Sequence, residues 1–271
     1  MSSDSIQTRA GDILRRLREQ KPLVHQITNF VVMNDTANVT LQVGALPVMA
    51  HAPEEMEEMV SLAGALVLNT GTLERPWIDA MITAGKHARL RGIPVVLDPV
   101  GAGATSYRTD TDLLIIRDVG PDIVRGNPGE IAALIGAGGE VRGVESVGTL
   151  DDPVAVAKLA ANAWGATVAM TGARDLITDG SRTLGVENGD RWLTTLTGTG
   201  CSSTAMVAAY AAVESDYVLA AAGALAHLGY AAEVAAKDAK GPGSFKAALH
   251  DAIYNMTPDM LAENMRAVEL G

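Results

Sequence analysis

A glycine-rich loop that holds the single cysteine of the chain is the first place where the sequence could do chemistry. The loop, at 196–201, reads LTGTGC, and the residues after it are small, apolar and compatible with a helix. Glycines let the backbone approach a ligand closely. The first amides of a helix lack internal partners and lie at the positive end of its dipole. The pattern predicts an anion site for a phosphate or a developing negative charge, made by Gly198, Thr199, Gly200 and Cys201.

Further polar residues follow short apolar runs elsewhere in the chain. Asp98 ends the run that begins at Ile93, and its hard oxygens suit Mg²⁺. Arg125 ends another apolar run, where an unpaired charge is costly, so a polyanion or an acidic partner is expected. Asn29 and Thr171 follow two more runs in the same way.

Several of these residues also have a structural interpretation that the sequence leaves open. Glu130 suits Mg²⁺ beside Asp98, but it also fits a first-turn helix acid favoured by the dipole. Asn127 fits a helix N-cap. Met49, at a strand end, suits a pocket wall and the core equally, and Cys201 can be an inert small hydrophobe. The sequence has no Cys/His cluster, so zinc is not expected.

The elements that must position these residues alternate along the chain. Parallel strands are predicted at 23–29, 45–49, 65–69, 93–98, 122–125 and 167–170. Helices are predicted at 4–20, 30–42, 53–62, 76–91, 111–119, 127–135, 152–164, 202–213, 217–236, 244–256 and 258–268. An uninterrupted apolar run such as 65–69 is typical of a strand buried on both faces.

The alternation of strands and helices ends with three closely spaced predicted strands at 175–178, 182–187 and 191–195. The hairpin signals DG and NG lie between them. They predict an antiparallel edge on an otherwise parallel sheet. The fold class is therefore α/β, with helices on both faces of a mostly parallel central sheet. Such sheets bind ligands at the carboxyl ends of their strands, where all the candidate residues fall. We expect one domain over residues 1–271, with a glycine-rich surface segment at 136–148.

Composition narrows the function classes. The 271 residues are 48% hydrophobic, which is ample for a core, and carry a net charge of −11, which argues against a nucleic-acid partner. One cysteine excludes an internal disulfide framework and favours a reducing cytoplasm. The first residues lack a secretory pattern, and the apolar stretches are interrupted before they reach membrane-spanning length, so no membrane partner is expected.

Together these motifs resemble the hydroxyethylthiazole kinase family of the ribokinase-like superfamily. The resemblance runs from about residue 23 to the C-terminal helices, with the motifs in the family's order. The segments that carry it are QITN at 26–29, GALPVMA at 44–50, LDPVGAGAT at 97–105, RGNPGE at 125–130 and TGTGC at 197–201. It implies a three-layer α/β/α fold and transfer of a phosphoryl group from ATP to the hydroxyl of methyl-hydroxyethyl-thiazole, which salvages the thiazole half of thiamine.

The resemblance also implies a role for each candidate residue. Met49 and Gly198 match positions that contact the thiazole. Arg125 and Thr171 match positions that contact the ATP phosphates, with Asn127 beside them. Asp98 and Glu130 match the acidic Mg²⁺ region, while the loop from Gly198 to Cys201 matches the anion hole and catalytic position.

Family members form trimers with the active site between subunits, which implies that Met49 or Asn29 lies near a neighbour's site. Relatives in the wider superfamily usually have Asp where this chain has Cys201, as the base that takes the alcohol proton. The cysteine favours a thiazole kinase over a hydroxymethylpyrimidine kinase and leaves the base open. A helix N-terminus is expected to lower the pKa of Cys201 and favour its thiolate in the free protein, whereas bound ATP opposes this.

Two other function classes remain open from the sequence. A cysteine-dependent acyl-transfer enzyme would use Cys201 as nucleophile with His227 or His250 as base, although nothing in the sequence brings either histidine close. A non-catalytic nucleotide sensor would keep the glycine loop and Arg125 without needing an acid at Asp98. ATP-dependent consumption of an alcohol distinguishes kinase activity from both.

Overall fold

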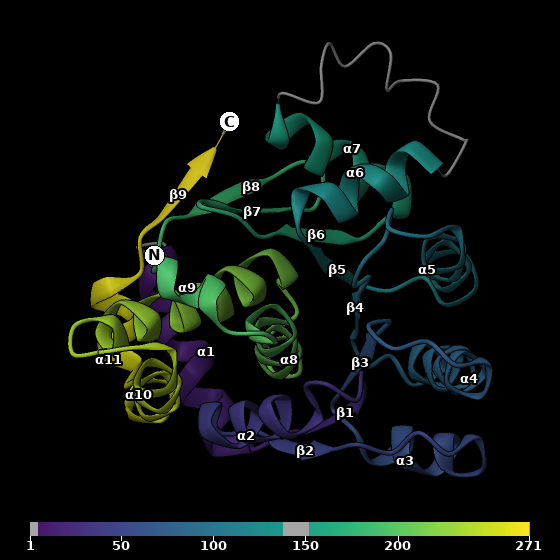
Figure 1. Ribbon diagram of the computed structural model, residues 1–271, viewed down its shortest axis with the longest axis horizontal. Helices are drawn as coiled ribbons and strands as arrows, with labels where there is room; N and C mark the ends of the chain where they lie inside the picture. Colours follow the sequence, from purple (N-terminus) through teal and green to yellow (C-terminus); the bar gives the residue numbers. More distant parts are fainter. Residues whose placement is uncertain (1–4, 138–151, 271) are drawn as a thin grey trace.

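The computed structural model describes residues 5–137 and 152–270, so most of the predicted glycine-rich segment at 136–148 lies outside the described residues. Within these residues, nine strands form one sheet in the order β2-β1-β3-β4-β5-β6-β7-β8-β9 (Figure 1). The strands are β1 (Leu23–Ile27), β2 (Leu46–Val48), β3 (Ala65–Asn69), β4 (Val95–Asp98), β5 (Ile123–Gly126), β6 (Thr167–Met170), β7 (Asp175–Thr178), β8 (Thr183–Val186) and β9 (Ala267–Leu270).

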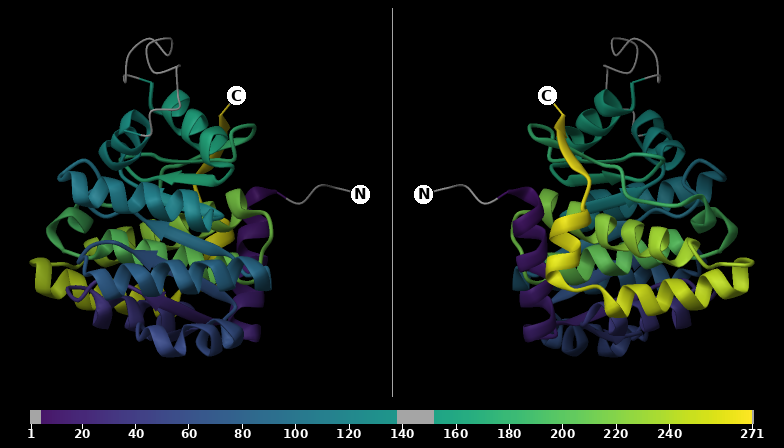
Figure 2. Two further views of the ribbon diagram at one scale, coloured as in Figure 1. Left: turned by 90° about the vertical axis from the view of Figure 1, so that its right-hand side faces the viewer. Right: turned by 90° about the vertical axis from the view of Figure 1, so that its left-hand side faces the viewer.

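Helices cover both faces of this sheet, as the sequence predicts (Figures 1 and 2). One layer holds α1 (Ile6–Gln20), α2 (Met33–Val43), α8 (Thr199–Ala211), α9 (Tyr217–Ala236), α10 (Pro242–Asn255) and α11 (Pro258–Asn264). The other holds α3 (Met56–Leu62), α4 (Arg75–Arg91), α5 (Ser106–Val119), α6 (Pro128–Ala137) and α7 (Pro153–Trp164).

Each central strand supplies side chains to two separate cores. In β3, Ala65 and Val67 pack into the core under α8 and α9, while Leu66 and Leu68 pack into the core under α4. Successive strand side chains point to opposite faces, so a strand covered on both sides must be apolar throughout. This is why the run at 65–69 predicts a central strand so clearly.

Strands β1 to β6 are parallel, and the remaining pairs are antiparallel. The predicted strand at 191–195 is wrong, because this segment is the 3₁₀ helix η2 (Arg191–Thr195). The side chain of Asp190 accepts the Trp192 amide at 2.9 Å and begins the helical turn. The open edge of β8 pairs with β9 instead. Strand β9 begins at Ala267, so the helix predicted at 258–268 is shorter than expected.

Two helix starts bear on the candidate site. Helix α5 begins at Ser106 rather than at 111, because the Thr105 side chain caps it by accepting the Arg108 amide. Helix α8 begins at Thr199, with Gly198 as its N-cap at φ +85°, a left-handed conformation that suits glycine. Cys201 is therefore the third residue of α8, inside its first turn.

Helix α9 is long and apolar enough to cross a membrane, the one such helix in the described part of the chain. However, 83% of its apolar window is buried within the protein. Its length and composition therefore reflect a core helix between the sheet and α10.

Candidate active site

The carboxyl ends of β3 and β4 bring the first pair of polar side chains together. Asn69 and Asp98 are register partners at the ends of these parallel strands, and both side chains are buried. The Asn69 amide nitrogen donates to Asp98 Oδ2 at 2.8 Å. Thr204, from α8, donates its hydroxyl to the same oxygen at 2.9 Å. A helix from the other end of the sequence is thereby tied to the strand ends.

Asp98 keeps one oxygen without a hydrogen bond. No described residue is a hydrogen-bond partner of Asp98 Oδ1, although Arg125 Nη1 lies 3.6 Å from it. Burial raises the pKa of Asp98, while Arg125 and the Thr204 hydroxyl lower it. A buried, half-paired carboxylate next to an arginine is a group with unused capacity for a cation or a proton.

Cys201 lies against the same cluster. Asn69 Nδ2 is 3.2 Å and Asn29 Nδ2 is 3.6 Å from its sulfur, so two amides donate to Sγ. Burial and the neighbouring Asp98 raise the pKa of the thiol to about 12. The expected thiolate of the free protein is therefore wrong, because desolvation and a nearby acid outweigh the helix N-terminus.

Arg125 connects the strand ends to the glycine loop. Its Nη2 donates to Thr171 Oγ1 at 2.6 Å, across the neighbouring strands β5 and β6. A Cβ on Gly200 would lie 2.7 Å from Arg125 Nη1, so the glycine is what lets the guanidinium rest against the start of α8. Arg125 Nε is buried and has no partner among the described residues, which leaves a donor for a ligand.

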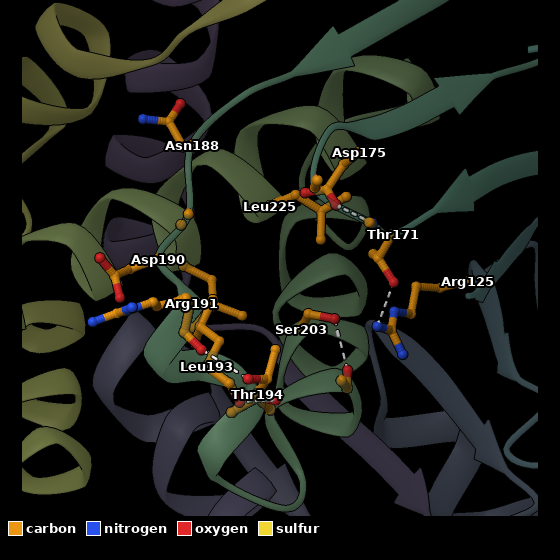
Figure 3. Close-up of a pocket in the computed structure, with 17 residues that line it drawn as sticks. Arg125, Thr171, Asp175, Asn188, Asp190, Arg191, Leu193, Thr194, Ser203 and Leu225 are labelled. Carbon is orange, nitrogen blue, oxygen red and sulfur yellow. Dashed lines mark hydrogen bonds between the residues drawn. The ribbon is translucent and has the colours of Figure 1, made fainter. Parts of the chain in front are cut away.

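A cavity of about 630 Å³ extends from this guanidinium (Figure 3). Arg125 and Thr171 lie at one end and Asn188, Asp190 and Arg191 at the other, while Leu193 and Leu225 contribute apolar wall between them (Figure 3). Asp175 also lines it, and burial raises the pKa of this carboxyl to about 6, against the opposing effect of the Gly172 amide that it accepts. The cavity therefore combines a cationic end at Arg125 with a wall that is partly apolar and partly polar.

Glu130 and Asn127 form a reciprocal cap at the start of α6. Asn127 Oδ1 accepts the Glu130 amide at 2.9 Å, and Glu130 Oε2 accepts the Asn127 amide at 2.8 Å. Glu130 Oε1 accepts the Gly101 amide at 2.9 Å, in the loop after β4. The capping interpretations of both residues are thus confirmed, and both carboxylate oxygens of Glu130 already accept backbone amides.

The other predicted residues lie around this centre. Asn29 follows β1, and its amide also donates to Asn69 Oδ1 at 2.8 Å. Met49 is half-buried and follows β2, the strand beside β1 at the sheet edge, where its carbonyl accepts a hydrogen bond from His51. Gly198 and Thr199 begin α8.

Several residues of this site escape the sequence reasoning. Asn69 was expected among the polar residues that follow strands, because it ends an entirely apolar run, but the sequence assigned it no role. Thr204 gave none, since its role depends on α8 packing against β4. Asp112 on α5 is fully buried, no described residue is a hydrogen-bond partner of either oxygen, and burial raises its pKa to about 8.

The histidines proposed as bases for acyl transfer are engaged elsewhere. His227 is buried, with Nδ1 2.8 Å from the Tyr210 hydroxyl, and burial lowers its pKa to about 3. His250 Nδ1 lies 2.7 Å from Gln42 Oε1. Because the described hydrogen bonds of Cys201 come from asparagines, the structure gives the thiol no histidine base.

The family model described as the hydroxyethylthiazole kinase family matches residues 14–259. The chain belongs to this family. A hydroxyethylthiazole kinase from Roseiflexus sp. (strain RS-1) is 61% identical over 268 residues, covering 99% of each chain. One from Desulforudis audaxviator is 57% identical over 270 residues, covering 100% of this chain and 99% of the relative.

Solved structures give the same assignment at the level of the fold. The hydroxyethylthiazole kinase protein from Pyrococcus horikoshii OT3 superposes with a TM-score of 0.90 at 45% identity, covering 97% of this hydroxyethylthiazole kinase family member and 99% of that chain. Pyridoxal kinase from Staphylococcus aureus has a TM-score of 0.64 at 16% identity, covering 92% and 98%, which shows a shared fold alone. The ribokinase-like α/β/α architecture expected from the sequence is confirmed.

Proposed function

We propose that this protein is an ATP-dependent kinase that phosphorylates the hydroxyl of 4-methyl-5-(2-hydroxyethyl)thiazole, in thiamine salvage. Family membership supports the reaction class and the substrate. The observation that carries it is the contact of Arg125 with both Thr171 and the first turn of α8, at the end of a cavity large enough for a ligand of nucleotide size.

The cavity favours one orientation of a bound nucleotide. The phosphates lie against Arg125, Thr171 and the amides of Gly198 to Cys201, where a guanidinium and a helix N-terminus favour anions. The base lies farther along the cavity, where Leu193 contributes an apolar wall beside Asp190 and Arg191 (Figure 3). Asn127, expected near ATP from the resemblance, caps α6 and contributes to this site through the position of Glu130.

The thiazole alcohol lies on the other side of the α8 start, toward Asn29, Met49 and Gly198. Phe30 and Val31, next to Asn29, are 53% and 65% exposed. Exposed apolar side chains beside a site are typical of a surface that is covered in an assembly. We propose that a homotrimer covers this edge and that each active site lies between two subunits.

Residues near Asp98 fit Mg²⁺ in part. Asp98 Oδ1 has no described hydrogen-bond partner, whereas Glu130 has only its remaining lone pairs to offer, through water. Among the described residues, no three His, Cys, Asp or Glu side chains are arranged to hold a metal. The free oxygen of Asp98 suits Mg²⁺, which keeps several waters and binds substrate phosphates; when bound, it would neutralise charge on the transferring group.

The residues around Cys201 then act on the alcohol. Asn69 and Asn29 hold the sulfur by donating to it, so the thiol lies in a fixed position beside the first amides of α8. Cys201 orients the hydroxyl as a thiol, since its pKa is about 12. The alcohol oxygen forms a bond to the γ-phosphorus as the bond to ADP breaks, and the alcohol proton leaves late, to the transferred phosphoryl oxygens or to water, so a loose transition state needs little help from a base.

An assay of ADP release tests the function. We expect turnover with the thiazole alcohol and Mg²⁺-ATP, with a phosphorylated thiazole as product, and much slower turnover with pyridoxal or hydroxymethylpyrimidine. ATP binding without turnover of any alcohol would instead indicate a nucleotide sensor. We further propose that residues 1–271 act as one kinase domain and that the protein works in the cytoplasm.

Arg125→Ala provides the matched test of the phosphate site. Removing the guanidinium deletes the contact to Thr171 and the cation beside Gly200, so kcat/KM should fall far more than the melting temperature. Arg117→Ala is the control, because Arg117 is an exposed arginine on α5 that pairs with Asp118. A kcat/KM of Arg125→Ala within about threefold of wild type, under ~0.7 kcal/mol, would show that Arg125 does not bind the phosphates.

A further inference from the structure

Arg108 is a cation at the wrong end of a helix for its charge. It is the third residue of α5, at the positive end of the dipole, where arginine is disfavoured. Its side chain is half-buried, and it forms no ion pair within residues 5–137 and 152–270. This placement needs a compensating contact, and the contact lies directly behind the active site.

The Arg108 guanidinium spans two strand-end loops. Nη1 donates to the Thr70 carbonyl at 2.9 Å and to the Val100 carbonyl at 2.8 Å. Nη2 donates to the Gly71 carbonyl at 3.0 Å. Thr70 and Gly71 follow Asn69 at the end of β3, and Val100 lies two residues after Asp98 at the end of β4. Arg108 therefore joins the two loops that carry the central polar pair.

Gly71 transmits this contact to the site by a short route. Its carbonyl accepts from Arg108, while its amide donates to Asn69 Oδ1 at 3.0 Å. Asn69 in turn donates to Asp98 Oδ2 and Cys201 Sγ. A Cβ on Gly71 would lie 2.5 Å from the Asn29 amide nitrogen, so the glycine keeps this backbone close to the second asparagine.

The loop after β4 is held from two sides. Arg108 binds the Val100 carbonyl, and Glu130 Oε1 accepts the next amide, that of Gly101. A lysine at 108 offers a single ammonium in place of a planar fork of five donors, so it cannot reproduce three fixed contacts to two loops. The geometry thus depends on a guanidinium rather than on positive charge alone.

We propose that Arg108 is a positioning residue for phosphoryl transfer, which clamps the loops after β3 and β4 so that Asn69 stays in place to hold both Asp98 and Cys201. The proposal rests on the proposed kinase activity for its kinetic consequence, whereas its structural consequence is independent of activity. It assigns a function to a residue that touches neither the nucleotide cavity nor Cys201.

Kinetics of Arg108→Ala and Arg108→Lys test the clamp. We expect kcat to fall ~10²-fold in Arg108→Ala, the usual cost of misplacing reacting groups by about 1 Å. KM for ATP should stay within about threefold, because the phosphate contacts are untouched. Arg108→Lys should recover little of the loss, and Arg117→Ala should match wild type. Millimolar methylguanidinium should restore part of kcat in Arg108→Ala, while methylammonium should not.

Thiol labelling gives a readout that needs no turnover. Cys201 is the single cysteine, so a thiol reagent reports on one site. Loss of the clamp should loosen Asn69 and speed labelling of Cys201 in Arg108→Ala, but not in Arg117→Ala, under conditions where circular dichroism shows all variants folded. Arg108→Lys serves the same purpose if the alanine variant does not fold.

The two hypotheses fail in different ways. An inactive wild type would overturn the proposed function while labelling still tests the clamp. Wild-type kcat and labelling rate in a folded Arg108 variant would overturn the clamp. Activity lost only in proportion to the unfolded fraction, with no rescue by methylguanidinium, would also overturn it, since Arg108 would then serve folding alone.

Discussion

Two asparagine amides donate to the sulfur of Cys201 while Asp98 lies close enough to raise the pKa of the thiol. A thiol held in this way can orient an alcohol but is a poor base at neutral pH. We expect Cys201→Ser to retain measurable kcat. Cys201→Asp should keep or raise kcat, because a second carboxylate beside Asp98 has a raised pKa and is a better general base. Steady-state kinetics with the thiazole alcohol measure both.

The loss of kcat in Cys201→Ala tests whether Cys201 only orients the alcohol and assists removal of its proton. General base catalysis contributes ~10²–10⁴-fold, so a larger loss of kcat would indicate a covalent or structural function of Cys201. Mass spectrometry during turnover gives the decisive check. A phosphorylated Cys201 would contradict direct transfer from ATP to the alcohol.

The sequence could predict these residues only as far as strand ends reveal them. Asp98, Arg125 and Thr171 are polar residues that end or follow apolar runs, and parallel strands bring such ends to one edge. The protonation state of Cys201 could not be predicted, because the sequence indicates the helix N-terminus but not the burial of the thiol beside Asp98. Arg108 was missed for the same reason, since its partners are backbone carbonyls of other segments.

At the scale of elements, the contact between α8 and β5 depends on Gly200. In Gly200→Ala the new Cβ would lie 2.7 Å from Arg125 Nη1, so the guanidinium must move away from the phosphate site. We expect kcat/KM for ATP to fall at least tenfold, about 1.4 kcal/mol, with little change in melting temperature. Gly243→Ala in α10 is the control, because nothing lies within 4 Å of its Cβ position. Equal kcat/KM in the two variants would contradict the contact.

Asp112, which is buried on α5, makes the stability of the protein depend on pH. Burial raises its pKa to about 8 in the folded protein, against about 4 in the unfolded chain. Between these values the folded state holds the additional proton, so the free energy of unfolding falls as pH rises. Asp112→Asn removes this dependence. We expect its melting temperature, relative to wild type, to increase from pH 5 to pH 8.

Asp110→Asn is the matched control for that measurement, because Asp110 is exposed on the same helix. Its melting temperature relative to wild type should not change with pH. The same flat difference for Asp112→Asn would show that Asp112 does not stay protonated in the folded protein.

Element types followed from periodicity wherever a strand was buried on both faces or a helix had one apolar stripe. The failures lie at the antiparallel edge. Whether 191–195 or 267–270 occupies the open side of β8 depends on which segment reaches it, and the NG signal at 188–189 is local. The Asn188 side chain instead accepts the Arg266 amide at 2.8 Å, next to the C-terminal strand.

At the scale of the whole molecule, the β2 edge of the sheet has exposed apolar side chains close to the candidate site. Phe30 and Val31 lie exposed beyond the carboxyl end of β1, the strand next to the edge strand β2, while Leu46, 45% exposed, lies at the other end of β2 opposite Leu23. Phe30 also packs edge-on against Trp77, with ring centroids 4.7 Å apart, so the patch is ordered before any partner arrives. An open strand edge with ordered apolar neighbours suits a subunit interface.

Val31→Asp tests whether this surface forms the proposed trimer. A charge at a buried interface is costly to desolvate, so sedimentation should show wild-type trimers and a smaller species for the variant. Because Asn29 and Met49 are expected to lie near a neighbour's site, turnover should fall with the trimer fraction and recover at high protein concentration. Leu90→Asp is the control, since Leu90 is 83% exposed on α4 and should leave both properties unchanged. A fully active monomer would show that each subunit holds a complete site.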